Sequence, residues 1–304
     1  MSEPLPPGLK VIERGWLSAN MVLIDGPQRA VIDTGYVSHE TQTVSLVQAA
    51  FGAQGPDLLL NTHLHSDHCG GNAALQEHFP GLPTLIPPGL AEAVRLWDAR
   101  TLTYEPTGQR CRRFQFSGLL QPGQAIALGQ RTWHIHAAPG HDTHSIILFE
   151  PQSRCLISAD ALWENGFGVV FPELEGQDAF EAVADTLDLI ESLRPATVIP
   201  GHGAVFAYRA EVMDRSRRRL DAFVGEPLRH ARHAAKVLLK FKLLEVQQQA
   251  LPDFLDWAER AEYLQILHQR WHADQPRRQW LVELIEELKE AQAAALQDGW
   301  LLNR

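Results

Sequence analysis

Four side chains that can bind a metal ion lie close together in the segment Thr62-His63-Leu64-His65-Ser66-Asp67-His68. His63 and His65 are two residues apart, so on extended backbone their side chains point to the same side. Imidazole and carboxylate groups suit Zn(II), Fe(II) and Mn(II). Packing does not require such a density of donors. The segment is therefore interpreted as a metal-binding motif rather than a polar loop with capping residues.

Three later segments each place one or two further donors directly after an expected strand. They are Pro139-Gly140-His141-Asp142, Ser158-Ala159-Asp160 and Pro200-Gly201-His202-Gly203. The carboxyl end of a strand is where a sheet presents side chains to a crevice. Each segment alone is a weak signal, because an isolated Gly-His or Ala-Asp is often only a turn. Together, and in this order, they indicate one site.

These motifs resemble the metal-binding motifs of the metallo-β-lactamase superfamily. Asp33-Thr34-Gly35, after a strand expected at 29–33, is similar to that family's first motif. The resemblance covers roughly residues 9–206 and is similar in kind to the glyoxalase II, lactonase and RNase Z branches. It implies an α/β fold, a four-layer αββα sandwich, with a two-metal site at the edge between its two sheets.

The resemblance also implies a ligand set. Three histidines would bind the first metal, two histidines and a carboxylate the second, and one carboxylate would bridge the two. In that order the residues are His63, His65 and His141; Asp67, His68 and His202; and Asp160. Asp33 would fix a ligand or loop, since ligating histidines need an orienting partner. Its alternative role is to cap the turn at Gly35.

Two divalent ions about 3.5–4 Å apart can share a water and lower its pKa towards 7, which yields a nucleophile at neutral pH. Asp67 is then expected to orient the water and act as general acid and base. The expected cofactor is zinc, two ions per chain, with Fe or Mn as alternatives. The expected reaction is hydrolysis of a small-molecule carboxylic ester, either a thioester or a lactone.

Three other functions stay open. A metal-dependent endoribonuclease is disfavoured, because residues 1–206 carry a net charge of −11 and phosphate binding needs positive charge. Nucleic acid is accordingly disfavoured as a partner. An iron-dependent sulfur dioxygenase needs only one iron with open positions, which fits a seven-ligand set poorly. A binding or assembly module with a vestigial site is the non-enzymatic alternative.

Several residues near the motifs have two interpretations. His144 is either an electrophile or a structural residue that starts a strand. Cys69 is either an activated thiol or a small buried filler, the second being favoured. Trp163 and Phe167 lie in an aromatic, glycine-containing loop at 161–168 that either lines the substrate site or packs internally.

A group of arginines near residue 217 also has two interpretations. The favoured interpretation is a solvated helix face whose arginines pair partly with Asp214 and Asp221. The alternative is an anchor for an acidic substrate tail. The arginines are Arg215, Arg217, Arg218 and Arg219.

The first two thirds of the chain alternate short β-branched segments with helical periodicity. Strands are expected at 9–14, 20–25, 29–33, 57–61, 131–137, 145–150, 154–158 and 197–200. Helices are expected at 38–52, 70–79, 88–99 and 177–193.

After about residue 207 the strand signals end and glycine becomes rare, so an all-helical C-terminal domain is expected. Its helices are predicted at 208–223, 228–249, 253–271 and 277–297. We therefore expect a catalytic domain at residues 1–207 and a helical domain at residues 208–304. The helix at 228–249 has too many apolar residues for one stripe and should be buried on more than one side. This domain would either cap the metal cleft or pair two subunits in a homodimer.

No apolar run is long enough for a transmembrane helix, and the first residues lack the features of a secretory signal. The three cysteines, Cys69, Cys111 and Cys155, do not form a disulfide framework. A reducing, cytoplasmic location without membrane contact is expected.

Overall fold

A computed structural model of the chain describes residues 5–304. Its contacts divide the chain into two compact units. The first contains the chain up to Leu102 together with Arg110–Asp221, and the second contains Thr103–Gln109 with Ala222–Arg304. The assignment of catalysis to residues 1–207 and of a separate domain to 208–304 stays a prediction.

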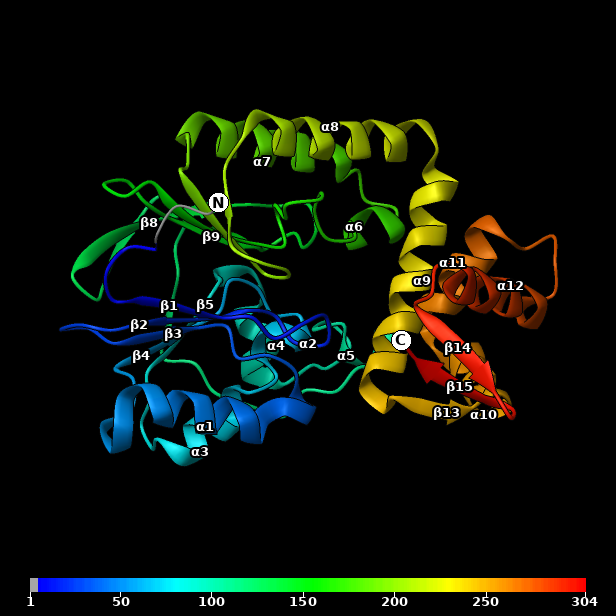
Figure 1. The fold of residues 1–304 in the computed structure, drawn as a ribbon, viewed down its shortest axis with the longest axis horizontal. Helices are drawn as coiled ribbons and strands as arrows, with labels where there is room; N and C mark the ends of the chain where they lie inside the picture. The colour runs from blue at the N-terminus through cyan, green and yellow to red at the C-terminus, as the bar shows by residue number, and fades with distance from the viewer. Residues whose placement is uncertain (1–4) are drawn as a thin grey trace. The chain divides into compact units, whose positions relative to one another are not determined.

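Two six-stranded sheets form the centre of the first unit (Figure 1). The first sheet has the order β1-β2-β3-β4-β5-β6 and the second β12-β11-β10-β9-β8-β7. The strands of the first are β1 (Leu9–Ile12), β2 (Met21–Ile24), β3 (Ala30–Ile32), β4 (Leu58–Leu60), β5 (Thr84–Ile86) and β6 (Gly118–Leu119). Those of the second are β7 (Ala125–Leu128), β8 (Arg131–Ala137), β9 (Ile146–Glu150), β10 (Cys155–Ala159), β11 (Thr197–Pro200) and β12 (Phe206–Ala207).

Helices cover the outer face of each sheet (Figure 1). The helices of the first half are α1 (Glu40–Phe51), α2 (Ser66–Cys69), α3 (Asn72–His78) and α4 (Ala91–Leu96), with 3-10 turns η1 (Val37–His39), η2 (Gly52–Gln54) and η3 (Pro88–Leu90). Those that follow the second sheet's strands are α6 (Phe171–Leu174), α7 (Phe180–Leu193) and α8 (Ala210–Gly225). The result is the expected four-layer α/β sandwich.

Strand β2 is apolar on both faces because it lies between two packed layers. Val22 and Ile24 belong to the core between the two sheets, whereas Met21 and Leu23 pack with residues of α1 and α3. Successive side chains of a strand alternate in direction, so a strand between two layers must be apolar throughout. All four residues are accordingly buried.

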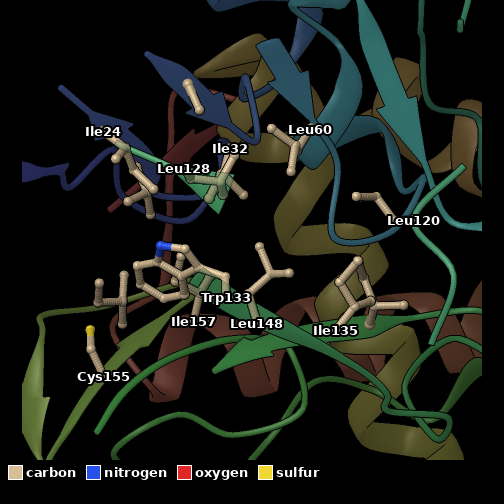
Figure 2. Packing of buried hydrophobic residues seen from close by; sticks show 14 residues of the cluster. Ile24, Ile32, Leu60, Leu120, Leu128, Trp133, Ile135, Leu148, Cys155 and Ile157 are labelled. Carbon is tan, nitrogen blue, oxygen red and sulfur yellow. The ribbon is translucent and has the colours of Figure 1, made fainter. Parts of the chain in front are cut away.

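The core between the sheets contains residues from both of them (Figure 2). Ile32 and Leu60 of the first sheet face Trp133 and Leu148 of the second. In β8 the buried Trp133 and Ile135 alternate with residues directed away from this core, as the period of a half-buried strand requires. This packing holds the two sheets face to face, so the loops at their common edge have fixed positions.

The second unit is mainly helical. It contains α5 (Tyr104–Thr107), α9 (Pro227–Val246), α10 (Leu251–Arg260), α11 (Glu262–Trp271) and α12 (Arg277–Glu290). Helix α9 contacts α11, α12 and β15, and its buried residues recur at four-residue spacing, including His230, Ala234, Leu238 and Leu239. These positions form one broad stripe, so burial on more than one side stays a prediction.

This C-terminal region is not all-helical, which corrects the sequence-based expectation. It contains a small sheet of β13 (Gln248–Ala250), β14 (Ala294–Gln297) and β15 (Trp300–Asn303), in the order β13-β15-β14. The helix predicted at 277–297 ends at Glu290, and its last part forms β14 instead. The helix predicted at 253–271 is two helices, because Ala261 has an extended backbone with ψ of 116°. None of the described helices is both long enough and apolar enough to cross a bilayer.

Candidate active site

The seven donors expected from the sequence come together at one edge of the sandwich. The structure forms three groups whose possible ligand atoms all lie within 4.8 Å of one another. They are His63, His65 and His141; His63, His68 and Asp160; and Asp67, His68 and His202. The first and third groups have the same members as the two expected ligand sets.

Strand direction explains this convergence. Strands β3 and β4 are parallel, so Asp33 and His63 follow the same end of the first sheet. In the second sheet β10 is parallel to β11, and Asp160 and His202 follow their carboxyl ends. The order of strands thus brings residues that are distant in sequence to one rim, as in other sheets that bind ligands at strand ends.

Helix α2 turns Asp67 and His68 into the site immediately after His65. Its close packing depends on the two glycines that follow. A Cβ atom at Gly70 would lie 2.5 Å from Ser66 O and 2.5 Å from Val37 N, so only glycine fits there. This is why the metal-binding motif continues as Cys69-Gly70-Gly71.

Asp33 orients His68, as expected for a carboxylate that supports a ligand. Its Oδ2 accepts a hydrogen bond from His68 Nδ1 at 2.8 Å, and its Oδ1 accepts one from the Thr62 backbone N–H at 2.9 Å. Asp33 has a φ of 58°, a conformation that is strained for most residues but tolerated by Asp and Asn. The backbone here is therefore adapted to hold one side chain in place.

Backbone carbonyls orient two other histidines. His141 Nδ1 lies 2.6 Å from Val169 O, and His202 Nδ1 lies 3.2 Å from Gly15 O. Donation from Nδ1–H directs Nε2 of each ring into the site, where His202 Nε2 lies 3.0 Å from Asp67 Oδ2. His65 differs, because its Nδ1 faces the other donors, 3.1 Å from His63 Nε2 and 2.8 Å from His141 Nε2.

Asp160 lies between the two expected ligand sets. Its Oδ2 is 3.3 Å from His141 Nε2, 3.5 Å from His68 Nε2 and 3.9 Å from His202 Nε2. The pairing of β10 with β11 shifts register just before it, and Ala159 has a φ of 47°. A bulge of this kind redirects the following side chain, which here reaches both sets.

The two sets differ in their protonation. Burial, followed by the neighbouring imidazoles, holds the pKa of His63 well below its usual range, and burial lowers the pKa of His141 to about 4. These rings are neutral and can donate lone pairs. Burial acts in the same sense on His68, but the carboxylates of Asp33, Asp160 and Asp67 outweigh it and raise its pKa well above the ordinary value.

The site fits divalent metal ions. Nε2 of His68 is fully buried and has no hydrogen-bond partner among the described residues, although Nδ1 of the same ring is bound to Asp33. A buried nitrogen without a partner is costly, and a metal ion would satisfy it. Imidazole nitrogens with carboxylate oxygens are the donors that zinc, iron and manganese accept.

Two aromatic residues border the site, and neither was identified from the sequence. Trp16 stacks on the imidazole of His202 with ring centroids 5.4 Å apart and planes 7° from parallel, and 56% of this residue remains exposed. Phe171 contacts the rings of His65 and His141 edge-on, at 5.3 and 5.7 Å. No motif marks either position, because only the folded chain brings them to the histidines.

Other candidate residues have structural roles. A Cβ atom at Gly89 would lie 2.0 Å from His144 Nδ1, so this imidazole packs against the backbone at Gly89, outside the three donor groups. Cys69 is fully buried, with its Sγ 3.8 Å from Cys111 Sγ. Phe167 is also buried, which agrees with the interpretation that it packs internally. Trp163, in contrast, lies beside His202.

Three of the four arginines near residue 217 contact other parts of the protein. Arg217 pairs with Asp188 and Glu191 of α7, each at 2.7 Å. The Arg215 guanidinium donates to the carbonyl oxygen of Glu164, and the Arg219 guanidinium lies 5.5 Å from the centroid of the Phe167 ring. These contacts hold α8 against α7 and against the loop that contains Glu164 and Phe167. They differ from the expected pairing with Asp214 and Asp221.

Comparison with known proteins identifies the family. Residues 14–202 match the sequence profile described as the Metallo-beta-lactamase superfamily. The chain belongs to this superfamily. The matched span contains all seven donors and ends at His202, so the family resemblance and the observed cluster refer to the same residues.

Curated relatives of this metallo-β-lactamase-fold chain include two kinds of hydrolase. It is 30% identical over 203 residues to the acyl-coenzyme A thioesterase MBLAC2 of Gallus gallus, which covers 62% of this chain and 73% of the relative. It is 29% identical over 163 residues to a hydroxyacylglutathione hydrolase of Cyanothece sp., over 51% of this chain and 54% of the relative. The protein is thus a hydrolase of the metallo-β-lactamase fold.

A solved structure extends the fold similarity to the whole chain. A beta-lactamase domain protein from Burkholderia ambifaria aligns over 100% of this chain and 94% of its own, with a TM-score of 0.61 and 18% identity. At this identity the comparison concerns the fold alone.

Proposed function

We propose that the protein is a dinuclear metal-dependent hydrolase of thioesters, with zinc as its metal. The observation that carries the proposal is the position of Asp160. One of its oxygens lies within 4 Å of histidine nitrogens from both donor sets, which suits a carboxylate shared by two ions. The thioester preference is supported by the two relatives, because an acyl-coenzyme A thioesterase and a hydroxyacylglutathione hydrolase both cleave thioesters.

Two bound ions would supply a polarised carbonyl and a water of lowered pKa. The protein's own groups would do the rest. His63, His65 and His141 are expected to hold one ion, and Asp67, His68 and His202 the other. The imidazoles of His68, His141 and His202 are already oriented by Asp33, Val169 O and Gly15 O, so these rings need little reorganisation when an ion binds.

Asp67 is proposed to hold and pass on a proton during the reaction. Its Oδ2 lies 3.0 Å from His202 Nε2, and the residue is only partly buried, so it faces both the donor set and the substrate side. The neighbouring imidazoles of His68 and His202 outweigh burial and hold the pKa of Asp67 below its ordinary value. The carboxylate is therefore ionised at neutral pH and can accept a proton.

The borders of the site favour an organic substrate over a polyanion. The exposed indole of Trp16 lies beside one donor set and the phenyl ring of Phe171 beside the other. Aromatic surfaces of this kind bind apolar parts of a ligand. The acyl group, the thiol portion, or both would lie against these rings.

The test is a comparison of substrate classes with the metal-loaded protein. Its metal content is measured first, and hydrolysis is then assayed with an acyl-coenzyme A, an acylglutathione, a lactone and an RNA. We expect two ions per chain and turnover of thioesters in preference to the others. Cleavage of RNA, or a single iron with oxygen consumption, would assign the chain to a different reaction.

A further inference from the structure

The indole of Trp163 contacts the carboxylate that lies between the two donor sets. Its Nε1–H donates a hydrogen bond to Asp160 Oδ1 at 3.2 Å. Oδ2 of the same carboxylate is the oxygen within 4 Å of His68, His141 and His202. The two oxygens of Asp160 therefore have separate partners, an indole on one side and the histidines on the other.

The backbone around Trp163 is fixed on several sides. The Trp163 N–H donates to Gly166 O at 2.6 Å, and Ser158 Oγ donates to Leu162 O at 2.7 Å. The Arg215 guanidinium binds the carbonyl of Glu164, the next residue. The side chain of Trp163 also contacts His202 edge-on at 5.6 Å. The indole is thus held in place before any ligand binds.

We propose that Trp163 is a positioning residue of the metal centre. By occupying Oδ1, its N–H leaves Oδ2 as the only oxygen of Asp160 that faces both donor sets. Without this hydrogen bond the carboxylate can rotate and offer both oxygens to one ion, and the sharing of Asp160 would be lost. The indole is a neutral donor, so it fixes the carboxylate without cancelling its charge.

This inference rests on the proposed two-metal function and adds a residue to it. It predicts that Trp163 affects the affinity for metal directly, before any substrate is present. Trp16 provides a matched control in the same place. It also contacts His202, and its ring lies 5.3 Å from that of Trp163, but its contacts with these residues are between rings.

The experiment compares Trp163→Phe with Trp16→Phe, since both keep an aromatic ring and lose an indole N–H. Metal-free protein is titrated with zinc in competition with a chromogenic chelator, and circular dichroism and thermal unfolding of each metal-free variant are recorded first. We expect Trp163→Phe to bind one of the two ions about 10- to 100-fold more weakly, as is usual when an outer partner of a ligand is removed. We expect Trp16→Phe to bind both ions as the unchanged protein does.

The outcomes separate this inference from the proposed function. If the unchanged protein binds fewer than two ions, the two-metal proposal itself fails. If it binds two and Trp163→Phe binds both equally tightly, only the role of Trp163 is overturned. Equal weakening in both variants would also overturn it, because ring packing rather than the hydrogen bond would then be responsible.

Discussion

Asp33 Oδ2 and His68 Nδ1 lie 2.8 Å apart, at the back of an imidazole whose other nitrogen has no hydrogen-bond partner in the described part of the chain. The carboxylate thus fixes the ring and directs its unpartnered Nε2 into the site. The same Asp33 oxygen also accepts a hydrogen bond from Thr62 Oγ1 at 2.7 Å, so its own position is fixed as well. The orientation of the His68 ring by Asp33 can therefore be tested separately from metal binding by His68 itself.

Replacing Asp33 with Asn tests that support. Asn tolerates the φ of 58° at this position, and its Oδ1 can still accept the hydrogen bond from the Thr62 backbone N–H, so the backbone should be retained. The lost charge should weaken the affinity of the Asp67-His68-His202 set for zinc about 10- to 100-fold. Chelator competition measures this, with Asp57→Asn, at a surface pair with Arg29, as the control. Unchanged affinity would show that Asp33 only shapes the turn.

Removal of ligands should lower metal content. We expect His63→Ala and Asp160→Ala to retain fewer ions than the unchanged protein and to lose turnover, because each group contributes to a predicted ligand set. His134→Ala and His268→Ala should keep the full content, since neither residue lies in the three donor groups. Elemental analysis of purified protein gives the count. Full activity of a metal-free His63→Ala protein would contradict the proposed mechanism.

Trp16→Ala should weaken substrate binding rather than the reaction itself. An aromatic contact contributes about 0.5–1.5 kcal/mol, so KM for a thioester with an apolar acyl group should rise about 2- to 10-fold, with kcat little changed. The control is Trp300→Ala, since that tryptophan is similarly exposed (48%) in the other unit. Equal KM values for the Trp16 variant and the unchanged protein would remove Trp16 from the substrate surface.

Glu150 should make stability depend on pH. It is only 1% exposed, and hydrogen bonds from Ser153 and Gln152, with the Arg131 guanidinium, outweigh burial and lower its pKa below 4.5. The unfolded chain therefore binds a proton more readily than the folded one, so this contribution is present above about pH 4.5 and is lost as the pH falls further.

Glu150→Gln should accordingly lower the free energy of unfolding by about 1–3 kcal/mol at pH 7. It should have a smaller effect near pH 3, where the native glutamate is also being protonated. Urea unfolding at both pH values measures the difference. Glu92→Gln, in an exposed pair with Arg95, should have little effect at either pH. A Glu150 variant that loses equal stability at both pH values would contradict the assignment.

Cys69 and Cys111 should form a disulfide under oxidation, since their sulfur atoms are already 3.8 Å apart. Hydrogen peroxide would take two electrons and two protons from the thiols and become two molecules of water. Intact mass should fall by the mass of two hydrogen atoms, and Cys111→Ser should abolish this loss. Cys155 should not react, because burial raises the pKa of its thiol to about 12. A mass gain of oxygen without cross-linking would contradict the prediction.

The sequence predicted strands of the first unit well where β-branched or alternating apolar residues mark them. The segment 131–137 matches β8 residue for residue, and 197–200 matches β11. The short strands β5, β6, β7 and β12 were not predicted, because segments of two to four residues carry little periodicity. Strands β13 to β15 were missed for a different reason. The sequences of β13 and β14 are rich in Gln and Ala, which favour helices, and only pairing with β15 makes them strands.

The sequence predicted the metal-binding donors of the candidate site but not the aromatic contacts beside them. The seven donors occur in short motifs that a sequence displays directly, so their proximity could be anticipated. Trp16 and the indole contact of Trp163 could not, because they depend on which loop of the folded chain covers His202. The partners of Arg217 were mistaken for the same reason, since nearby acids in the sequence were preferred to Asp188 and Glu191 on another helix.

The two sheets are joined by a short exposed turn between β6 and β7, at residues 121–124. Every donor set takes members from both sides of this turn: His63 and His65 with His141, and Asp67 and His68 with His202. A polypeptide divided there into two fragments has no complete set in either one. Reassembly of the fragments would then be strengthened by the metal, which would join them as a non-covalent cross-link. The turn is therefore a suitable place to divide the chain for fragment complementation. The metal concentration would then determine whether the two fragments associate.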